Sequence, residues 1–198
     1  MNVITVRWGN KYSEDYVYAL KAQVPQLKVL TVETGDLREP MRFHSWFSKL
    51  EVFRPENRHF RPCLFIDLDT FVIGSLAPFF KLDDTKLWLI RDLFQPEKRS
   101  NSGLFIAPEY GISDTIWERA QSLDMSRGGD GDFLNNFEHE KLQDYVSGIL
   151  SYKAHQLYEG PKNARIVCFH GRPKPADTDG WAQEHWQSCL KDSAMLNL

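Results

Sequence analysis

The sequence predicts an α/β fold of three layers, α/β/α, around a mainly parallel central sheet. Short apolar runs of strand length alternate along the chain with stretches whose apolar residues recur at helical spacing. This alternation favours parallel strands joined by helices that cover both faces of one sheet. The chain has 198 residues, of which 42% are hydrophobic, enough to bury a substantial core. We therefore expect a single compact domain over residues 1–198.

Strands and helices alternate from the start of the chain. Residues 3–6 form an apolar run that ends at Trp-Gly-Asn, which is typical of a buried strand followed by a turn. Ser13 is a suitable N-cap for a helix that runs to about residue 23. A second strand is expected over 27–32. Residues 46–53 are expected to be helical, because their apolar side chains recur at helical spacing.

Four further strands and two helices complete the alternation. The strands are expected over 62–66, 87–91, 103–107 and 165–169, and the helices over 113–123 and 132–137. The loops near 93–102 and 152–162, with the tail after Pro173, carry much of the charge and many of the prolines. They are candidates for acceptor-facing surface, or are plain solvated loops. Trp181 and Trp186 can form an acceptor platform, but packing of the tail over the sheet is the favoured role.

The composition limits which kinds of binding partner, and which cellular compartment, are expected for this protein. The net charge is −3 and the pI about 6.1, so no global positive field favours nucleic acid or an anionic membrane. The three cysteines are widely spaced and give neither a disulfide framework nor a metal knuckle. No apolar run approaches the roughly 20 residues that span a bilayer. We expect a soluble cytoplasmic protein with reduced thiols and no transmembrane segment.

Two aspartates mark the first candidate site. Asp67 and Asp69 follow the strongly apolar strand 62–66, at the edge where an α/β sheet usually holds its ligand. Two carboxylates so close repel each other unless a cation, strong donors or bulk water compensates. Mn²⁺ or Mg²⁺ would satisfy them, because hard divalent cations bind oxygen ligands of protein and phosphate together. A solvated turn or helix cap is the alternative, and the apolar run after Asp69 argues against it.

His170 marks the second candidate site, at the end of the expected strand 165–169. Gly171 allows close backbone approach to a ligand, and Lys174 supplies a point charge suited to phosphate. If this strand ends at the same sheet edge as Asp67, the imidazole can complete a metal shell. Mn²⁺ would then be preferred, since it accepts mixed nitrogen and oxygen ligands. A structural or merely exposed histidine is the alternative.

These motifs resemble the signature of family 8 glycosyltransferases, the glycogenin and galactinol synthase group. The resemblance covers nearly the whole chain. Each matching segment is common by itself, but the order and spacing of the segments together are specific. The matching segments are 8–12, 46–50, 64–70, 101–103, 129–134 and 170–175.

The resemblance implies an A-type glycosyltransferase fold of Rossmann-like character, a nucleoside diphosphate sugar as donor, most often a UDP-sugar, and Mn²⁺, with retention of anomeric configuration as the usual outcome. It assigns the metal to Asp67, Asp69 and His170. It implies catalytic roles for the two aspartates, for Lys174 at the diphosphate and for Asp130 at the sugar hydroxyls. It implies donor contacts for Trp8, Tyr12, Lys49, Asn101, Ser102, Gly171 and Lys174.

Each residue carried over also has a plain structural reading. Lys49 can be a solvated helix lysine and Tyr12 an aromatic at the core edge. Asn101 can shape a turn, and Asp130 can be a turn or N-cap residue.

The sequence departs from the family pattern at two places. The family commonly has an Asp-Gln pair where this chain has Asp130 and Gly131, so the identity of the donor sugar is open. Residues 33–36 read Glu-Thr-Gly-Asp, where the family often has an aspartate directly after the second strand.

Two other functions are considered. The segment around Asp67 and Asp69 also resembles the aspartyl-phosphate motif of haloacid dehalogenase-like phosphatases, but Phe71 stands where that motif has Thr or Val. A non-catalytic domain that binds a nucleotide-sugar is the other alternative. No motif identifies the acceptor, so glycan, lipid-linked glycan, protein, small molecule and modified nucleic acid stay open.

Overall fold

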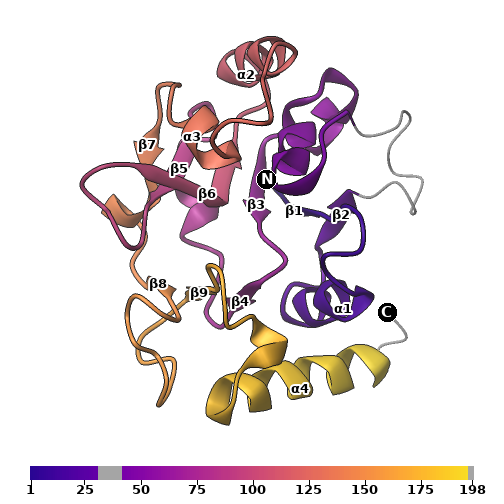
Figure 1. Ribbon diagram of the computed structural model, residues 1–198, viewed down its shortest axis with the longest axis vertical. Coiled ribbons are helices and arrows are strands. Elements are labelled where there is room, and N and C mark those ends of the chain that lie inside the picture. Colours follow the sequence, from indigo (N-terminus) through magenta and orange to yellow (C-terminus); the bar gives the residue numbers. More distant parts are fainter. Residues whose placement is uncertain (31–41, 196–198) are drawn as a thin grey trace.

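A six-stranded sheet forms the centre of the protein (Figure 1). The computed structural model describes residues 1–30 and 42–195. The strand order is β2-β1-β3-β6-β5-β7. The strands are β1 (Asn2–Val6), β2 (Lys28–Leu30), β3 (Cys63–Ile66), β5 (Trp88–Arg91), β6 (Ser100–Ala107) and β7 (Glu140–Lys141). The predicted strand 27–32 is therefore present as β2. Its last two predicted residues, and residues 33–36, lie outside the part of the chain that the structure describes.

The sheet is mixed, because β6 runs against both of its neighbours. β1 is parallel to β2 and β3, and β5 to β7, whereas β6 is antiparallel to β3 and β5. β6 also begins three residues earlier than the predicted strand 103–107. Ser100 and Asn101 pair with β5 beyond a register shift, so the end of the predicted loop 93–102 belongs to the sheet.

A second, three-stranded sheet has the order β4-β9-β8. Its strands are β4 (Thr70–Val72), β8 (Ile149–Ser151) and β9 (Ile166–Cys168). The predicted strand 165–169 is present as β9. It pairs antiparallel with β4 and parallel with β8, outside the central sheet.

The described helices are α1 (Glu14–Gln23), α2 (Ile112–Ala120), α3 (Asp130–Leu134) and α4 (Gly180–Met195), with 3₁₀ turns η1 (Ser45–Phe53), η2 (Pro55–Phe60), η3 (Phe79–Lys81), η4 (Leu142–Asp144) and η5 (Pro175–Asp177). The predicted helix 46–53 is thus the 3₁₀ segment η1. Ser13 does precede α1, but its hydroxyl bonds Asp15 instead of a backbone amide. The tail after Pro173 contains α4, which packs beside α1 (Figure 1). Its role as acceptor-facing surface stays a prediction.

Two hydrophobic clusters lie on opposite faces of the central sheet. β3 divides its side chains between them, with Leu64 and Ile66 in one cluster and Cys63 and Phe65 in the other. The first cluster is covered by α1, α4 and the second sheet, and the other by η1 and α2 (Figure 1). This arrangement confirms the predicted three layers. Trp186 is buried and its ring lies 4.8 Å from that of Tyr16, so it packs the tail, as favoured.

Candidate active site

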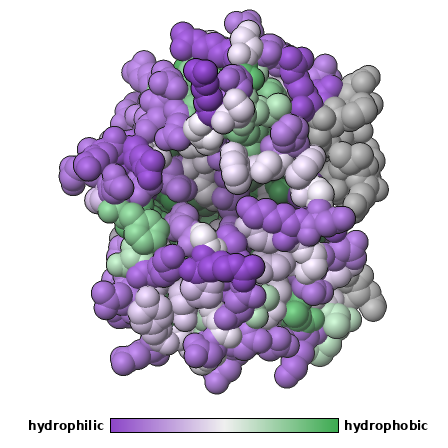
Figure 2. Space-filling view, in the orientation of Figure 1, coloured by the Kyte–Doolittle hydropathy of each residue, from purple (hydrophilic) through white to green (hydrophobic). Residues whose placement is uncertain are grey.

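A pocket of about 540 Å³ opens at the carboxyl ends of β1 and β3. Its volume falls in the usual range for small-molecule sites. In the orientation of Figure 1, the surface is hollowed at mid-height, between the half with β5 and β6 and the half with α1 and α4 (Figure 2). All of the predicted site residues line it: Trp8, Tyr12, Lys49, Asp67, Asp69, Asn101, Ser102, Asp130, His170, Gly171 and Lys174.

Asp67 and Asp69 lie in the link between the two sheets. β3 ends at Ile66, and β4 begins at Thr70. Because β4 pairs with β9, the backbone amide of Phe169 donates to the carbonyl of Asp69 at 3.1 Å. This pairing carries His170 to the aspartates. The condition that both strands end on one edge of the same sheet is not met, because β3 and β9 belong to different sheets; the pairing of β4 with β9 brings the residues together instead.

Gly103 leaves space for the side chains of Asn101 and Asp67, since a Cβ there would lie 3.0 Å from Asn101 Oδ1. A Cβ atom at this position would lie 3.3 Å from Asp67 Oδ2 and 3.8 Å from His170 Cε1. The Asn101 side chain accepts from the Gly103 amide at 2.7 Å, next to the register shift of β6. Bulged strands often aim side chains at active sites. Asn101 therefore shapes the strand locally as well as lining the pocket.

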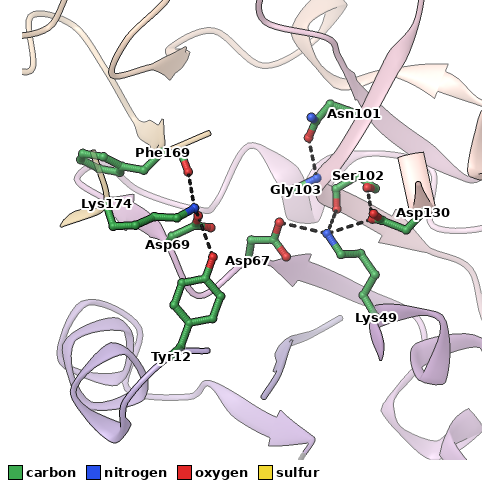
Figure 3. A network of polar contacts seen from close by, with 10 residues as sticks. All are labelled: Tyr12, Lys49, Asp67, Asp69, Asn101, Ser102, Gly103, Asp130, Phe169 and Lys174. Carbon is green, nitrogen blue, oxygen red and sulfur yellow. Dashed lines mark hydrogen bonds and ion pairs between the residues drawn. The ribbon is translucent and has the colours of Figure 1, made fainter. Parts of the chain in front are cut away.

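Lys49 holds one side of the pocket together. Its buried ammonium donates to Asp67 Oδ2 at 2.9 Å and to the carbonyl of Ser102 at 3.2 Å, and pairs with Asp130 Oδ2 at 3.0 Å (Figure 3). The Ser102 hydroxyl donates to the same carboxylate of Asp130. Asp130 is the first residue of α3, which suits an anion. The reading of Lys49 as a solvated lysine is therefore wrong.

Lys174 and Tyr12 hold the other side of the pocket (Figure 3). The Lys174 ammonium donates to Asp69 Oδ2 and, at 3.3 Å, to the carbonyl of Phe169. The Tyr12 hydroxyl donates to the same Asp69 oxygen at 3.0 Å. Burial, followed by the charges of Asp69 and Asp67, raises the pKa of Tyr12 above its usual range, so the phenol keeps its proton.

These groups form a cluster of three carboxylates and two ammonium ions. Desolvation raises the pKa of Asp67 to about 6, and the charges of Asp69 and Asp130 add to it against the opposing effect of Lys49. Burial lowers the pKa of Lys49, but Asp130 and Asp67 outweigh it and raise that pKa above its usual range. Lys49 is therefore charged. The cluster keeps an excess of carboxylate that an added cation would neutralise.

His170 has a nitrogen that no hydrogen bond satisfies. Its Nε2 is buried and without a partner among the described residues. Burial lowers the pKa of His170, so the imidazole is neutral and can act as a ligand. Such an orphaned atom beside two carboxylates fits a divalent metal that accepts nitrogen and oxygen, as Mn²⁺ does. Within residues 1–30 and 42–195, however, no three such groups converge as they would around a metal. Each of the two aspartates is paired with a lysine, Asp67 with Lys49 and Asp69 with Lys174.

The pocket also has an aromatic rim of Trp8 and Trp46, of which the sequence reasoning named Trp8 and missed Trp46. Trp46 lines the pocket and is 52% exposed, although helical spacing had placed it with the apolar face of 46–53. Ser45, directly before Trp46, has φ +57°, a left-handed conformation uncommon outside glycine. Trp8 is 40% exposed on the same pocket, with its ring 5.7 Å from that of His44.

Other expectations from composition are also tested. All three cysteines are free and buried in the described structure. No described helix combines the length and apolarity required to cross a bilayer. Gly171 has φ +69°, which agrees with a backbone position that favours glycine.

Comparison with known proteins shows the fold. No family model and no curated protein matches the sequence. Among solved structures, the glycosyltransferase GlyE of Streptococcus pneumoniae TIGR4 matches 99% of this chain at 18% identity with a TM-score of 0.68. The chain spans 62% of the length of that structure.

Two further structures match over nearly their whole length. The galactosyltransferase LgtC, in complex with donor and acceptor sugar analogues, matches 96% of this chain and 95% of its own at 14% identity and a TM-score of 0.56. A glycosyltransferase involved in glycosylation of the major capsid of PBCV-1 matches 96% of this chain and 99% of its own, at 11% identity and a TM-score of 0.59. The chain therefore has the A-type glycosyltransferase fold that its sequence predicted.

Proposed function

We propose that this protein is a metal-dependent glycosyltransferase that transfers a sugar from a nucleoside diphosphate sugar, with a UDP-sugar as the expected donor. The observation that carries the proposal is the unpartnered Nε2 atom of His170 in a pocket that also holds Asp67 and Asp69. A neutral imidazole and two carboxylates suit a metal that binds phosphate oxygens as well. The fold shared with GlyE and LgtC supports the same class of reaction.

Asp67, Asp69 and His170 would hold Mn²⁺, or Mg²⁺ as a second choice. When bound, the metal would supply positive charge to the departing diphosphate. Lys174 adds a mobile positive charge on the same side of the pocket, which suits a phosphate oxygen. Stabilisation of the leaving group is thus the main catalytic contribution expected of these residues.

Asp130 and Ser102 are suited to orient the donor sugar. Asp130 is fixed by Lys49 and by the Ser102 hydroxyl, so it is held as an acceptor and not as a free base or nucleophile. No other nucleophile is evident among the residues named here, and we expect retention through attack on the face that the diphosphate leaves. A Cβ at Gly131 would make only ordinary contacts with Ser100 and Ser102 of β6, so lack of space does not explain the missing amide side chain.

The aromatic rim is the expected place for the ring of a bound ligand. Trp8 and Trp46 both line the pocket and are partly exposed, so each can stack on a flat or apolar ring face. The acceptor itself is not identified by this chemistry. A cytoplasmic location remains part of the proposal.

The decisive assay measures UDP released from a panel of UDP-sugars with Mn²⁺, with Mg²⁺ and with EDTA. We expect release that requires the metal and that falls at least about a hundredfold in Asp69→Ala. Asp84→Ala, which removes an exposed carboxylate away from the pocket, serves as the matched control and should retain full activity. Undiminished metal-dependent release in Asp69→Ala would contradict the assignment.

The phosphatase alternative has little structural support. Two strands, β1 and β2, precede the strand that ends at Asp67, and the Phe71 side chain is buried against Phe169. Release of inorganic phosphate from a simple phosphoester, without nucleotide turnover, would favour it.

A further inference from the structure

Lys174 occupies a carboxylate that the proposed function assigns to a metal. Its ammonium donates to Asp69 Oδ2, the oxygen that also accepts from Tyr12. An ammonium and a divalent cation on one carboxylate repel each other, since little water separates them in a partly buried pocket. A metal bound at Asp69 would therefore weaken the hold of this carboxylate on the Lys174 ammonium.

We infer that Lys174 couples metal binding to diphosphate binding. Without metal, its ammonium neutralises Asp69; when Asp69 becomes a metal ligand, the ammonium moves to the diphosphate of the donor. This inference rests on the proposed function and deepens it, because it predicts that metal and donor strengthen the binding of each other.

Lys174 is better suited to this exchange than Lys49. The Lys49 ammonium is held by two carboxylates and a carbonyl, and its side chain is 9% exposed. The Lys174 side chain is 19% exposed and its ammonium contacts one carboxylate and one carbonyl. Lys49 is therefore a fixed counter-ion. The Lys174 ammonium is held by fewer polar groups, and its side chain can extend into the pocket.

The backbone at Lys174 is anchored independently of its side chain. Prolines precede and follow it, which restricts the chain on both sides. Its amide donates to the Asp177 carboxylate at 3.4 Å at the start of η5. The flexible four-carbon side chain can then move between Asp69 and a nearby phosphate without movement of the fold.

If Lys174 exchanges partners in this way, removing its charge should strengthen the binding of Mn²⁺ and weaken the binding of UDP. In Lys174→Met, Asp69 loses its internal cation, so Mn²⁺ alone should bind about 5- to 150-fold more tightly, the usual size of such couplings. UDP, measured at saturating Mn²⁺, should bind more weakly, because the diphosphate loses its ammonium partner. General electrostatics alone would also favour Mn²⁺ when a nearby positive charge is removed, so the tightening must exceed that of a control lysine and must depend on Asp69.

The test measures Mn²⁺ binding by the electron paramagnetic resonance signal of the free ion, and UDP binding by calorimetry. Lys153→Met is the matched control: its ammonium lies near Gly171 but donates to the Arg172 carbonyl, so both affinities should change little. Lys174→Gln provides a second, polar variant, and circular dichroism checks that each variant folds. In an Asp69→Asn background, Lys174→Met should no longer tighten Mn²⁺ binding.

Unchanged or weaker Mn²⁺ binding in folded Lys174→Met and Lys174→Gln would overturn the exchange. Equal tightening in Lys153→Met would also overturn it, because the effect would then be general electrostatics. Failure of the proposed function looks different: wild-type protein would bind no UDP at any Mn²⁺ concentration, while the Mn²⁺ measurement alone would still decide whether Lys174 competes for Asp69.

Discussion

At the scale of single residues, the site depends on how buried charges are compensated. Lys49 lies between Asp67 and Asp130 and bonds both, so it prevents their direct repulsion. The carboxylates are only partly solvated, and Asp67 keeps 32% of its side chain exposed to the pocket. Removing a buried counter-ion costs far more than losing a surface ion pair.

Lys49→Met should therefore destabilise the protein by about 2–3 kcal/mol, below the usual cost of a fully buried pair because Asp67 remains partly solvated. The double variant Lys49→Met/Asp130→Asn should recover part of that loss, since one of the two stranded carboxylates is removed. Urea unfolding measures both. Equal stability of wild type and Lys49→Met would show that the carboxylates need no internal cation.

The sequence allowed most of these residues to be named, but not their contacts. Asp67, Asp69 and His170 stand at strand ends, which local patterns reveal. The bonds from Tyr12 and Lys174 to Asp69 join residues far apart in the chain, and no local pattern encodes them. The exposure of Trp46 was missed for the same reason, because helical spacing does not report the turn at Ser45.

At the scale of elements, the small sheet β4-β9-β8 carries His170 to the aspartates. Its strand β9 was predicted, but the separate sheet was not, because the pairing of β9 with β4 and β8 is non-local and leaves no signal in the local pattern. Its corner at Gly148 is tight. Gly148 has φ +81°, and its carbonyl accepts from the amides of Arg165 and Ile166 at 2.7 and 3.0 Å.

Gly148→Ala should destabilise the protein by about 1–3 kcal/mol. A Cβ there would lie 2.8 Å from the Asn163 carbonyl oxygen and 2.9 Å from the Arg165 amide nitrogen, both backbone atoms that cannot easily yield. Gly160→Ala is the matched control, because a Cβ at Gly160 meets nothing within 4 Å. Thermal unfolding should show a lower Tm for the first variant and little change for the second. A neutral Gly148→Ala would mean that this corner readily rearranges.

At the scale of the whole molecule, the layers follow from the alternation of strands and helices, and the sequence predicted them correctly. It did not predict the reversed direction of β6, because strand direction depends on the path of the connections and not on side-chain pattern. The two cores bury all three cysteines. Burial raises the pKa of Cys63 to about 12 and of Cys189 to about 11, and raises that of Cys168 as well.

The folded protein should therefore react slowly with a thiol reagent at pH 8, because a raised thiol pKa leaves almost no thiolate at that pH. Unfolding in denaturant should release all three thiols. The rate of colour formation with Ellman's reagent, with and without denaturant, measures this. Rapid reaction of a thiol in the folded state would contradict the burial described here.

The central claim is that one pocket binds a nucleotide-sugar through a metal held at Asp69. A thermal-shift measurement with UDP-sugars, each with and without Mn²⁺, tests it most directly, because a ligand that binds only the folded state raises Tm. We expect Tm to rise by about 5 °C or more at a ligand concentration of a hundred times Kd. That rise should require Mn²⁺ and be lost in Asp69→Ala. No response to any UDP-sugar, or an equal response in Asp69→Ala, would contradict the account.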